Sequence, residues 1–223
     1  MKKIHYINIG NPKSGTSAVF NVLCQHPEVD YCKAKENYGY SQYYWTLEQY
    51  IDYYKNFNVS LNFCPTQWAM ESKQIRELES VFTHASMIFR NPVDFIESHL
   101  NFLSQLNLLQ IDKHNDYESF VNMLLETNWL EYTKIVKRWT GLSRRPFLIL
   151  LYDELTADPA MFYTKITNFI GIDVYDFDTS NRINVTKNKN ASIVLTEKQI
   201  TTINLLVEEF EEYSQYSLSH WKI

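Results

Sequence analysis

A short polar turn near the N-terminus carries residues suited to binding an anion. The stretch INIGNPKSGTSAVF, residues 7–20, runs from an apolar segment through two glycines into a helix-like sequence. A turn at a helix N-terminus points backbone N–H groups and the positive end of the helix dipole toward an anion. We therefore expect a phosphate or sulfate group to be bound by Lys13, Ser14, Gly15, Thr16 and Ser17.

The position of the lysine in this turn argues against an ATPase. The ATPase loop reads G-x-x-x-x-G-K-[ST], with its lysine directly after the second glycine. Here Gly10 and Gly15 match the glycines and Ser17 matches the last position, but Thr16 stands where the lysine belongs. The cation is Lys13, inside the loop, where it can approach an oxygen that bridges two groups rather than the terminal phosphates of a triphosphate.

Two further segments place polar residues after apolar runs. In FRNPVDFIESH, residues 89–99, Arg90 follows one run and Ser98 lies eight positions later. Guanidinium and hydroxyl groups can both donate hydrogen bonds to a phosphate. In LILLYDELTADP, residues 148–159, Tyr152 ends the most apolar run of the chain.

These residues must be held by alternating strands and helices. Apolar runs predict strands at 4–9, 85–90 and 146–152. Helical spacing, capping residues and stop signals predict helices at 17–25, 46–57, 91–106, 117–139 (one or two helices), 158–171 and 196–212. We therefore expect one α/β domain over residues 1–223, P-loop-like, with a central parallel sheet flanked by helices. Ligands on such sheets bind at the carboxyl ends of the strands.

Three motifs in order resemble the sulfotransferases that use 3′-phosphoadenosine 5′-phosphosulfate (PAPS). They are P-K-S-G-T-S after the first strand, the Arg–Ser pair, and YDEL…DP…FIG. The resemblance implies that the loop holds the 5′-phosphosulfate, that Arg90 and Ser98 hold the 3′-phosphate, and that Tyr152 lies near the adenine. It implies no metal. Family members close a late loop over the nucleotide, and Lys187 and Lys189 are candidates for it; a solvated surface loop is the other interpretation.

The resemblance also suggests a catalytic base. Residues 26–40 resemble the heparan-type carbohydrate sulfotransferases, whose K-E-x-[HY]-[FY] motif supplies a glutamate base. The match gives Glu36 as the base and Lys35 and Tyr38 as substrate-binding residues, although Gly39 replaces an aromatic. His99 is the alternative base, with His84 a weaker third. Lys13 suits the developing charge on the leaving oxygen.

The leading hypothesis is transfer of a sulfuryl group from PAPS, which leaves as 3′-phosphoadenosine 5′-phosphate (PAP), to a hydroxyl or amine of a carbohydrate or other small molecule. A nucleotide kinase-like phosphotransferase and a degenerate nucleotide-binding protein are the alternatives.

The net charge of −5 argues against a nucleic-acid partner. No run approaches the length of a membrane span, so we expect no membrane partner and a cytoplasmic protein. The three cysteines lack CxxC spacing and are expected to be free thiols.

Overall fold

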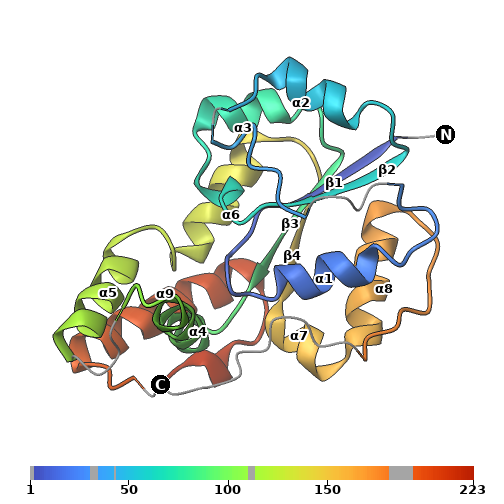
Figure 1. The fold of residues 1–223 in the computed structure, drawn as a ribbon. Coiled ribbons are helices and arrows are strands. Elements are labelled where there is room, and N and C mark those ends of the chain that lie inside the picture. Colours follow the sequence, from blue (N-terminus) through green and yellow to red (C-terminus); the bar gives the residue numbers. More distant parts are fainter. Residues whose placement is uncertain (1–2, 31–34, 43, 110–113, 181–192) are drawn as a thin grey trace. The chain divides into compact units, whose positions relative to one another are not determined.

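The computed structural model describes residues 3–30, 35–42, 44–109, 114–180 and 193–223. Within them the chain alternates between strands and helices (Figure 1). The elements in order are β1 Ile4–Asn8, α1 Thr16–Leu23, α2 Leu47–Tyr54, β2 Val59–Phe63, the 3₁₀ turn η1 Gln67–Ala69, α3 Ser72–Leu78, β3 His84–Phe89, α4 Pro92–Gln105, α5 His114–Glu126, α6 Tyr132–Leu142, β4 Phe147–Leu151, α7 Tyr152–Ala157, α8 Pro159–Ile170, α9 Glu197–Ser214 and the 3₁₀ turn η2 Ser219–Trp221.

The strands form a parallel sheet in the order β2-β1-β3-β4. This confirms the predicted α/β fold with a parallel sheet flanked by helices. Three strands were predicted, but β2 was not. Its sequence, VSLNF, interrupts apolar residues with Ser60 and Asn62, yet all five of its residues are buried. A polar residue in such a strand needs a hydrogen-bond partner, which a sequence alone does not reveal.

Helix limits follow the capping signals. The Asn91 side chain accepts a hydrogen bond from the Val93 N–H at the start of α4, and Pro92 is the first helical residue. Asp158 caps α8 in the same way, accepting from the Met161 N–H, and Gly171 ends the helix in a left-handed conformation. The short helices α3 and α7 were not predicted. Within the described residues no helix is long and apolar enough to cross a membrane.

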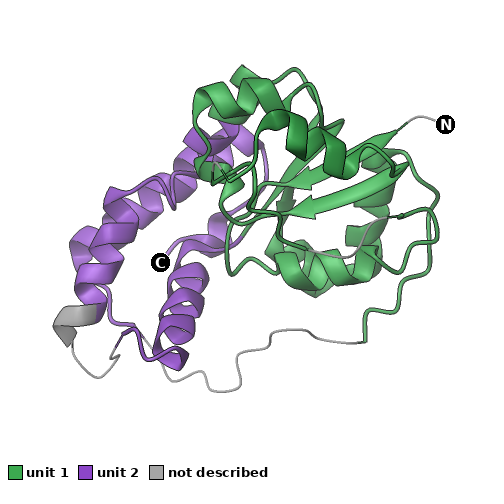
Figure 2. Ribbon diagram, turned by 45° about the horizontal axis from the view of Figure 1, so that its top comes forward, with its two compact units in different colours: residues 1–89, 138–184 green, residues 90–137, 185–223 purple. Residues whose placement is uncertain are grey.

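The chain divides into two compact units, coloured separately in Figure 2. Unit 1 comprises residues 1–89 and 138–184 and contains the whole sheet. Unit 2 comprises residues 90–137 and 185–223 and is helical where it is described. The expectation of one domain over residues 1–223 stays a prediction.

One face of the sheet in unit 1 buries an apolar core. Alternate residues of the strands point to it, including Ile4 and Tyr6 of β1 and Leu61 and Phe63 of β2. Helices α1 and α8 cover this face with Val19, Phe20, Val22, Leu23, Phe162, Tyr163, Ile166 and Ile170. Because α1 is packed here along its length, its N-terminus is fixed at the carboxyl end of β1.

The opposite face of β1 and β2 is buried but polar. The His5 ring contacts the Ser60 hydroxyl at 2.7 Å and the Tyr50 hydroxyl at 2.9 Å. Tyr50 lies on α2 and also accepts a hydrogen bond from the Asn62 amide at 2.9 Å. Burial lowers the pKa of His5 to about 3, so this histidine is neutral at physiological pH. Helix α2 is therefore joined to the sheet by hydrogen bonds as well as by packing.

Unit 2 has its own aromatic core. Tyr132 of α6 packs edge-on against Phe210 of α9, and its hydroxyl donates to the Arg90 carbonyl at 2.8 Å. The Gln199 amide of α9 donates to the Asn122 side chain of α5 at 2.8 Å. The hydroxyl–carbonyl contact fixes the backbone of Arg90 at the start of this unit.

Candidate active site

The loop between β1 and α1 has the backbone of an anion-binding turn. Gly10 and Gly15 have positive φ values of 100° and 80°, and Lys13 has a φ of 66°. A lysine in the left-handed region is uncommon and strained, so the surrounding structure must hold it there. An added Cβ at Gly10 would lie 2.8 Å from the Pro65 Cα, which shows how closely the loop packs against the chain after β2.

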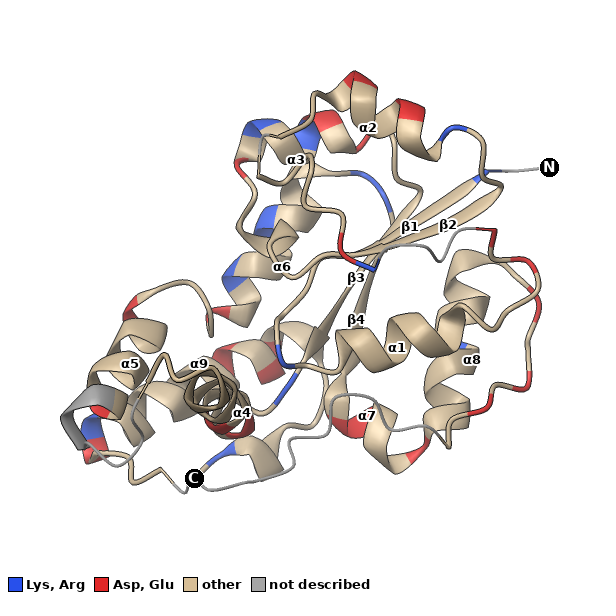
Figure 3. Cartoon of the chain, in the orientation of Figure 1, with Lys and Arg blue, Asp and Glu red and all other residues tan. Residues whose placement is uncertain are grey.

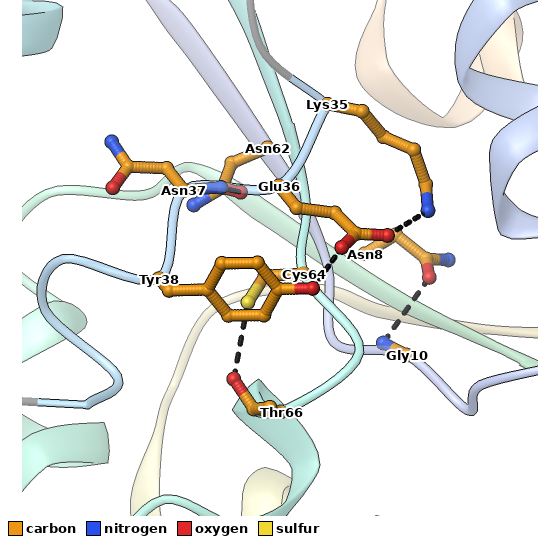
Figure 4. A network of polar contacts seen from close by, with 9 residues as sticks. All are labelled: Asn8, Gly10, Lys35, Glu36, Asn37, Tyr38, Asn62, Cys64 and Thr66. Carbon is orange, nitrogen blue, oxygen red and sulfur yellow. Dashed lines mark hydrogen bonds and ion pairs between the residues drawn. The ribbon is translucent and has the colours of Figure 1, made fainter. Parts of the chain in front are cut away.

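The polar end of β1 holds the start of the loop. The buried Asn8 amide donates to the Ser86 hydroxyl on β3 at 2.9 Å. The Asn8 side-chain oxygen accepts from the Gly10 N–H at 3.3 Å (Figure 4). The Trp68 N–H donates to the Ile9 carbonyl at 2.9 Å. The loop therefore leaves the sheet in one defined direction.

Two polar groups of the loop are buried without a partner among the described residues. They are the Asn11 side-chain amide nitrogen and the Ser14 hydroxyl. A buried polar group without a hydrogen-bond partner destabilises a fold by about 1–3 kcal/mol. A bound anion would accept hydrogen bonds from these groups and so remove this destabilisation. These donors, Lys13 and the α1 N-terminus fit a phosphosulfate group. Asn11 was not predicted; its only sequence signal is a polar residue between Gly10 and Pro12.

Tyr152 lies against the loop. An added Cβ at Gly15 would be 2.9 Å from the Tyr152 ring, and the Leu155 side chain would be 3.2 Å away. The structure thus brings Tyr152 together with the loop residues, while its predicted place near an adenine stays a prediction.

Glu154, an acidic residue that follows β4, takes part in an ion pair. The Glu154 carboxylate accepts from the Lys165 amine at 2.9 Å and from the Leu151 N–H at 3.0 Å, so it joins α7 to α8. In the part of the chain that the structure describes, no three His, Cys, Asp or Glu side chains could jointly hold a metal ion.

A second polar group lies beside β2 in the same unit (Figure 4). The Glu36 carboxylate is hydrogen-bonded by the Lys35 amine on one oxygen and by the Tyr38 hydroxyl on the other. The segment that carries them is tied to the strand, because the Phe63 N–H donates to the Lys35 carbonyl at 3.0 Å. The structure therefore brings together all three residues predicted from the K-E-x-Y motif.

The departure from the motif at Gly39 has a structural reason. An added Cβ at Gly39 would lie 2.4 Å from the Trp45 indole, and the Trp45 N–H donates to the Gly39 carbonyl at 2.8 Å. Any side chain at position 39 would displace Trp45. The indole takes up space that an aromatic residue at position 39 would need.

Cys64 lies next to this group. Its buried thiol contacts the Thr66 hydroxyl at 3.2 Å and the Ser41 hydroxyl at 3.7 Å. Burial raises the pKa of the thiol, which keeps it protonated and inert. The expectation of a free thiol is confirmed for Cys64 and wrong for Cys24, which is disulfide-bonded.

Arg90, Ser98 and His99 belong to unit 2. Arg90 directly follows β3, while Ser98 and His99 are half-buried on α4. The His99 ring packs against Phe95, Phe120 and Trp129, with centroid distances of 5.4–5.6 Å. This aromatic packing is typical of a histidine that lines a site rather than one that transfers a proton. The role of His99 as an alternative base stays a prediction, as do the phosphate contacts of Arg90 and Ser98.

Three predicted residues remain: His84, a possible base, and Lys187 and Lys189, which were predicted to close over the nucleotide. His84 begins β3 at the end of the sheet opposite the loop, and its ring packs against Phe169. It is therefore poorly placed to act as the base. Lys187 and Lys189 lie outside the described residues.

Charges of both signs are interspersed over the elements. Basic residues lie on α3 and α6 and in loops, with acidic residues near them, and the segment after α8 is acidic (Figure 3).

Comparisons with solved structures identify proteins of similar fold. The chain is similar over 99% of its length to a solved sulfotransferase from Alicyclobacillus acidocaldarius, at 17% identity, 99% coverage of that chain and a TM-score of 0.73. A mouse sulfotransferase solved in complex with PAP gives 15% identity, coverage of 96% and 88%, and a TM-score of 0.55. The sulfotransferase domain of the curacin biosynthetic pathway gives 14% identity, coverage of 92% and 98%, and a TM-score of 0.55.

At these identities, the solved structures establish the fold alone. No curated protein sequence matches the chain. The sequence model of the sulfotransferase domain, in contrast, matches residues 3–222, nearly the whole chain. The chain therefore belongs to the sulfotransferase domain family.

Proposed function

We propose that this sulfotransferase takes its sulfuryl group from PAPS and transfers it to a hydroxyl or amine of a carbohydrate or other small molecule. The observation that carries the proposal is the presence in one unit of a lysine-bearing anion loop and a lysine–glutamate–tyrosine group. The family match over residues 3–222 supports treating the whole chain as one sulfotransferase domain.

The proposed chemistry gives these two groups different tasks. The acceptor oxygen or nitrogen attacks sulfur, and the bond from sulfur to the 5′-phosphate oxygen breaks. The bonding electrons leave with PAP, where Lys13 and the N–H groups at the start of α1 stabilise the new negative charge. The acceptor proton passes to Glu36, whose carboxylate oxygens keep lone pairs beyond those bonded by Lys35 and Tyr38.

The resemblance supplies the remaining assignments. Arg90 and Ser98 are proposed to bind the 3′-phosphate, Tyr152 to contact the nucleotide, and Lys187 and Lys189 to close over it. Lys35 and Tyr38 are proposed to bind the acceptor or the sulfuryl group as well as to hold Glu36. His99 remains the alternative base.

The structure offers no support for the alternative function, a nucleotide kinase. A kinase of this fold would need a lysine at position 16 and an acid available for Mg²⁺ after a strand. Position 16 is a threonine, and the Glu154 carboxylate is already paired with Lys165.

The test is transfer of label. The protein is incubated with sulfur-labelled PAPS and a panel of sugars, phenols and amines, and in parallel with ATP–Mg²⁺ labelled in the terminal phosphate. We expect label from PAPS on at least one acceptor class and none from ATP. Transfer from ATP alone would refute the proposal.

A further inference from the structure

A row of buried polar side chains runs across the sheet and ends at the segment that carries Glu36. It passes from Ser60 to His5 at 2.7 Å, from His5 to Tyr50 at 2.9 Å, and from Tyr50 to Asn62 at 2.9 Å. The Asn62 oxygen then accepts from the Asn37 N–H at 3.4 Å. Asn37 directly follows the proposed base.

The amide of Asn37 continues the row. Its oxygen accepts from the Gly39 N–H at 3.0 Å, and its nitrogen donates to the Tyr54 hydroxyl at 3.4 Å. On the other side of Glu36, the Lys35 carbonyl accepts from the Phe63 N–H at 3.0 Å. Both neighbours of Glu36 are thus tied to β2 or α2, although Glu36 itself lies in neither a helix nor a strand.

These amides are unusual choices for their positions. Asn62 is fully buried within a strand, and Asn37 is only 7% exposed. An apolar side chain at such a position gains about 25 cal/mol per Å² of buried surface, whereas a buried amide must find a partner for every donor and acceptor. Packing alone does not explain two asparagines that bond the same short segment.

We infer that Asn62 and Asn37 are positioning residues that fix the backbone directly after Glu36 and so aim its carboxylate at the acceptor. The inference rests on the proposed function, because it gives Glu36 the role of base. A misplacement of about 1 Å at a reacting group can cost about 100-fold in rate. A loop lacks the internal hydrogen bonds that hold a strand or helix, so the sheet must supply this precision.

The chain offers a matched control for a purely structural role. Ser60 lies two residues before Asn62 on the same buried face of β2, and its hydroxyl bonds only the far end of the row, at His5. Ser60→Ala removes a buried hydrogen bond but leaves the contacts of Asn62 and Asn37 in place. Asn62→Ala cuts the row next to Glu36.

The first measurement is amide hydrogen exchange with PAP present. In Asn62→Ala we expect exchange in residues 35–39 to become about tenfold faster or more, because the segment loses its tie to the sheet. Ser60→Ala should leave exchange in these residues as in the wild type. Equal exchange in the two variants would overturn the inference. If Asn62→Ala does not fold, Tyr54→Phe, which removes only a hydroxyl, is measured against Ser60→Ala instead.

The second measurement separates rate from binding. Water serves as the probe acceptor: its oxygen attacks the sulfur of PAPS, its proton passes to Glu36, and PAP and sulfate are released. Asn62→Ala should lower this rate by about tenfold or more while the Kd for PAP stays within about threefold of wild type. A variant that is merely less stable would lose binding capacity and rate together, and that result, or an unchanged rate, would contradict the inference.

The two measurements keep the proposals distinct. If the wild type neither binds PAP nor hydrolyses PAPS, the proposed function fails. The exchange experiment, run then without nucleotide, still shows whether Asn62 and Asn37 hold residues 35–39. If PAP binds and PAPS is hydrolysed but the Asn62 variant behaves as Ser60→Ala does, only the positioning role fails.

Discussion

Lys13 is proposed to act on the leaving group and Glu36 on the acceptor. Their substitutions should therefore change the transfer rate and the PAP affinity in different ways. In the proposed reaction, Lys13 stabilises the charge that develops on the leaving oxygen. Lys13→Ala should therefore lower the rate of sulfuryl transfer strongly and weaken PAP binding somewhat, because the product also carries charge there. Rates with saturating PAPS and calorimetric PAP titration measure the two effects.

Glu36→Gln keeps the shape of the side chain but cannot take up a proton. We expect PAP affinity to stay nearly unchanged and the transfer rate to fall by about 10²–10⁴, the usual range for loss of a general base. Near-normal turnover in this variant would move the base to His99, and His99→Ala would then lose activity instead.

Gly15 tests the geometry of the loop itself. In Gly15→Ala the new methyl group would meet the Tyr152 ring at 2.9 Å, in a backbone conformation with φ of 80°. Left-handed strain alone costs about 1–3 kcal/mol, so both stability and PAP affinity should fall.

Gly141 is the matched control for this substitution. It lies in α6, where an added Cβ would come within 4 Å of no described atom beyond its chain neighbours and the backbone of its own helix, and it is not among the residues with positive φ. Gly141→Ala should be neutral or stabilise the protein by up to about 1 kcal/mol, because alanine favours helix. Thermal unfolding with and without PAP compares the two variants, and equal effects would contradict the loop geometry.

At the scale of elements, the sequence predicts what local chemistry decides. Asn91 with Pro92 marks the start of α4, and Gly171 marks the end of α8, because caps act on their own helix. Strand β2 was missed because its stability depends on partners far away in sequence. Ser60 bonds His5, and Asn62 bonds Tyr50 and Asn37.

The candidate site divides in the same way. The loop residues and the K-E-x-Y group were predictable, since each lies on one short stretch. The buried donor of Asn11 and the ties from Asn62 could not be predicted, because burial and pairing appear only after the strands have been placed side by side.

His5 makes the stability of the β1–β2–α2 layer depend on pH. Its pKa falls from 6.5 in the unfolded chain to about 3 in the fold, so between these values the unfolded state binds more protons. The histidine therefore favours the native state fully above pH 6.5, and this contribution is lost as pH falls, by up to about 1.4 kcal/mol per pH unit.

Urea unfolding of wild type and His5→Gln at several pH values between 7 and 4 isolates this effect. The glutamine variant should be less stable at pH 7, and the difference in free energy of unfolding should narrow as pH falls. A difference that is independent of pH would mean that the pKa of His5 is the same in the folded and the unfolded chain.

For the whole molecule, the family resemblance assigns a task to Arg90 in unit 2. Arg90→Ala should weaken PAP binding by more than about tenfold through loss of a charge-assisted phosphate grip. Adenosine 5′-phosphosulfate, which lacks the 3′-phosphate, should bind equally to both forms. The Tyr132 contact uses the Arg90 carbonyl and survives the substitution. Arg76→Ala, at an exposed arginine on α3, is the control. Equal losses for both nucleotides would place Arg90 elsewhere.

The central claim is a PAPS site in a chain whose loop lacks the ATPase lysine, and one calorimetric comparison tests it most directly. The protein is titrated with PAP in the presence of a metal chelator, and separately with ATP and Mg²⁺. The account predicts tight binding of PAP without metal and much weaker binding of ATP–Mg²⁺. A ligand at about 100 times its Kd also stabilises the fold by about 2.7 kcal/mol, so a thermal shift should accompany PAP. Binding of ATP–Mg²⁺ with no binding of PAP would contradict the account.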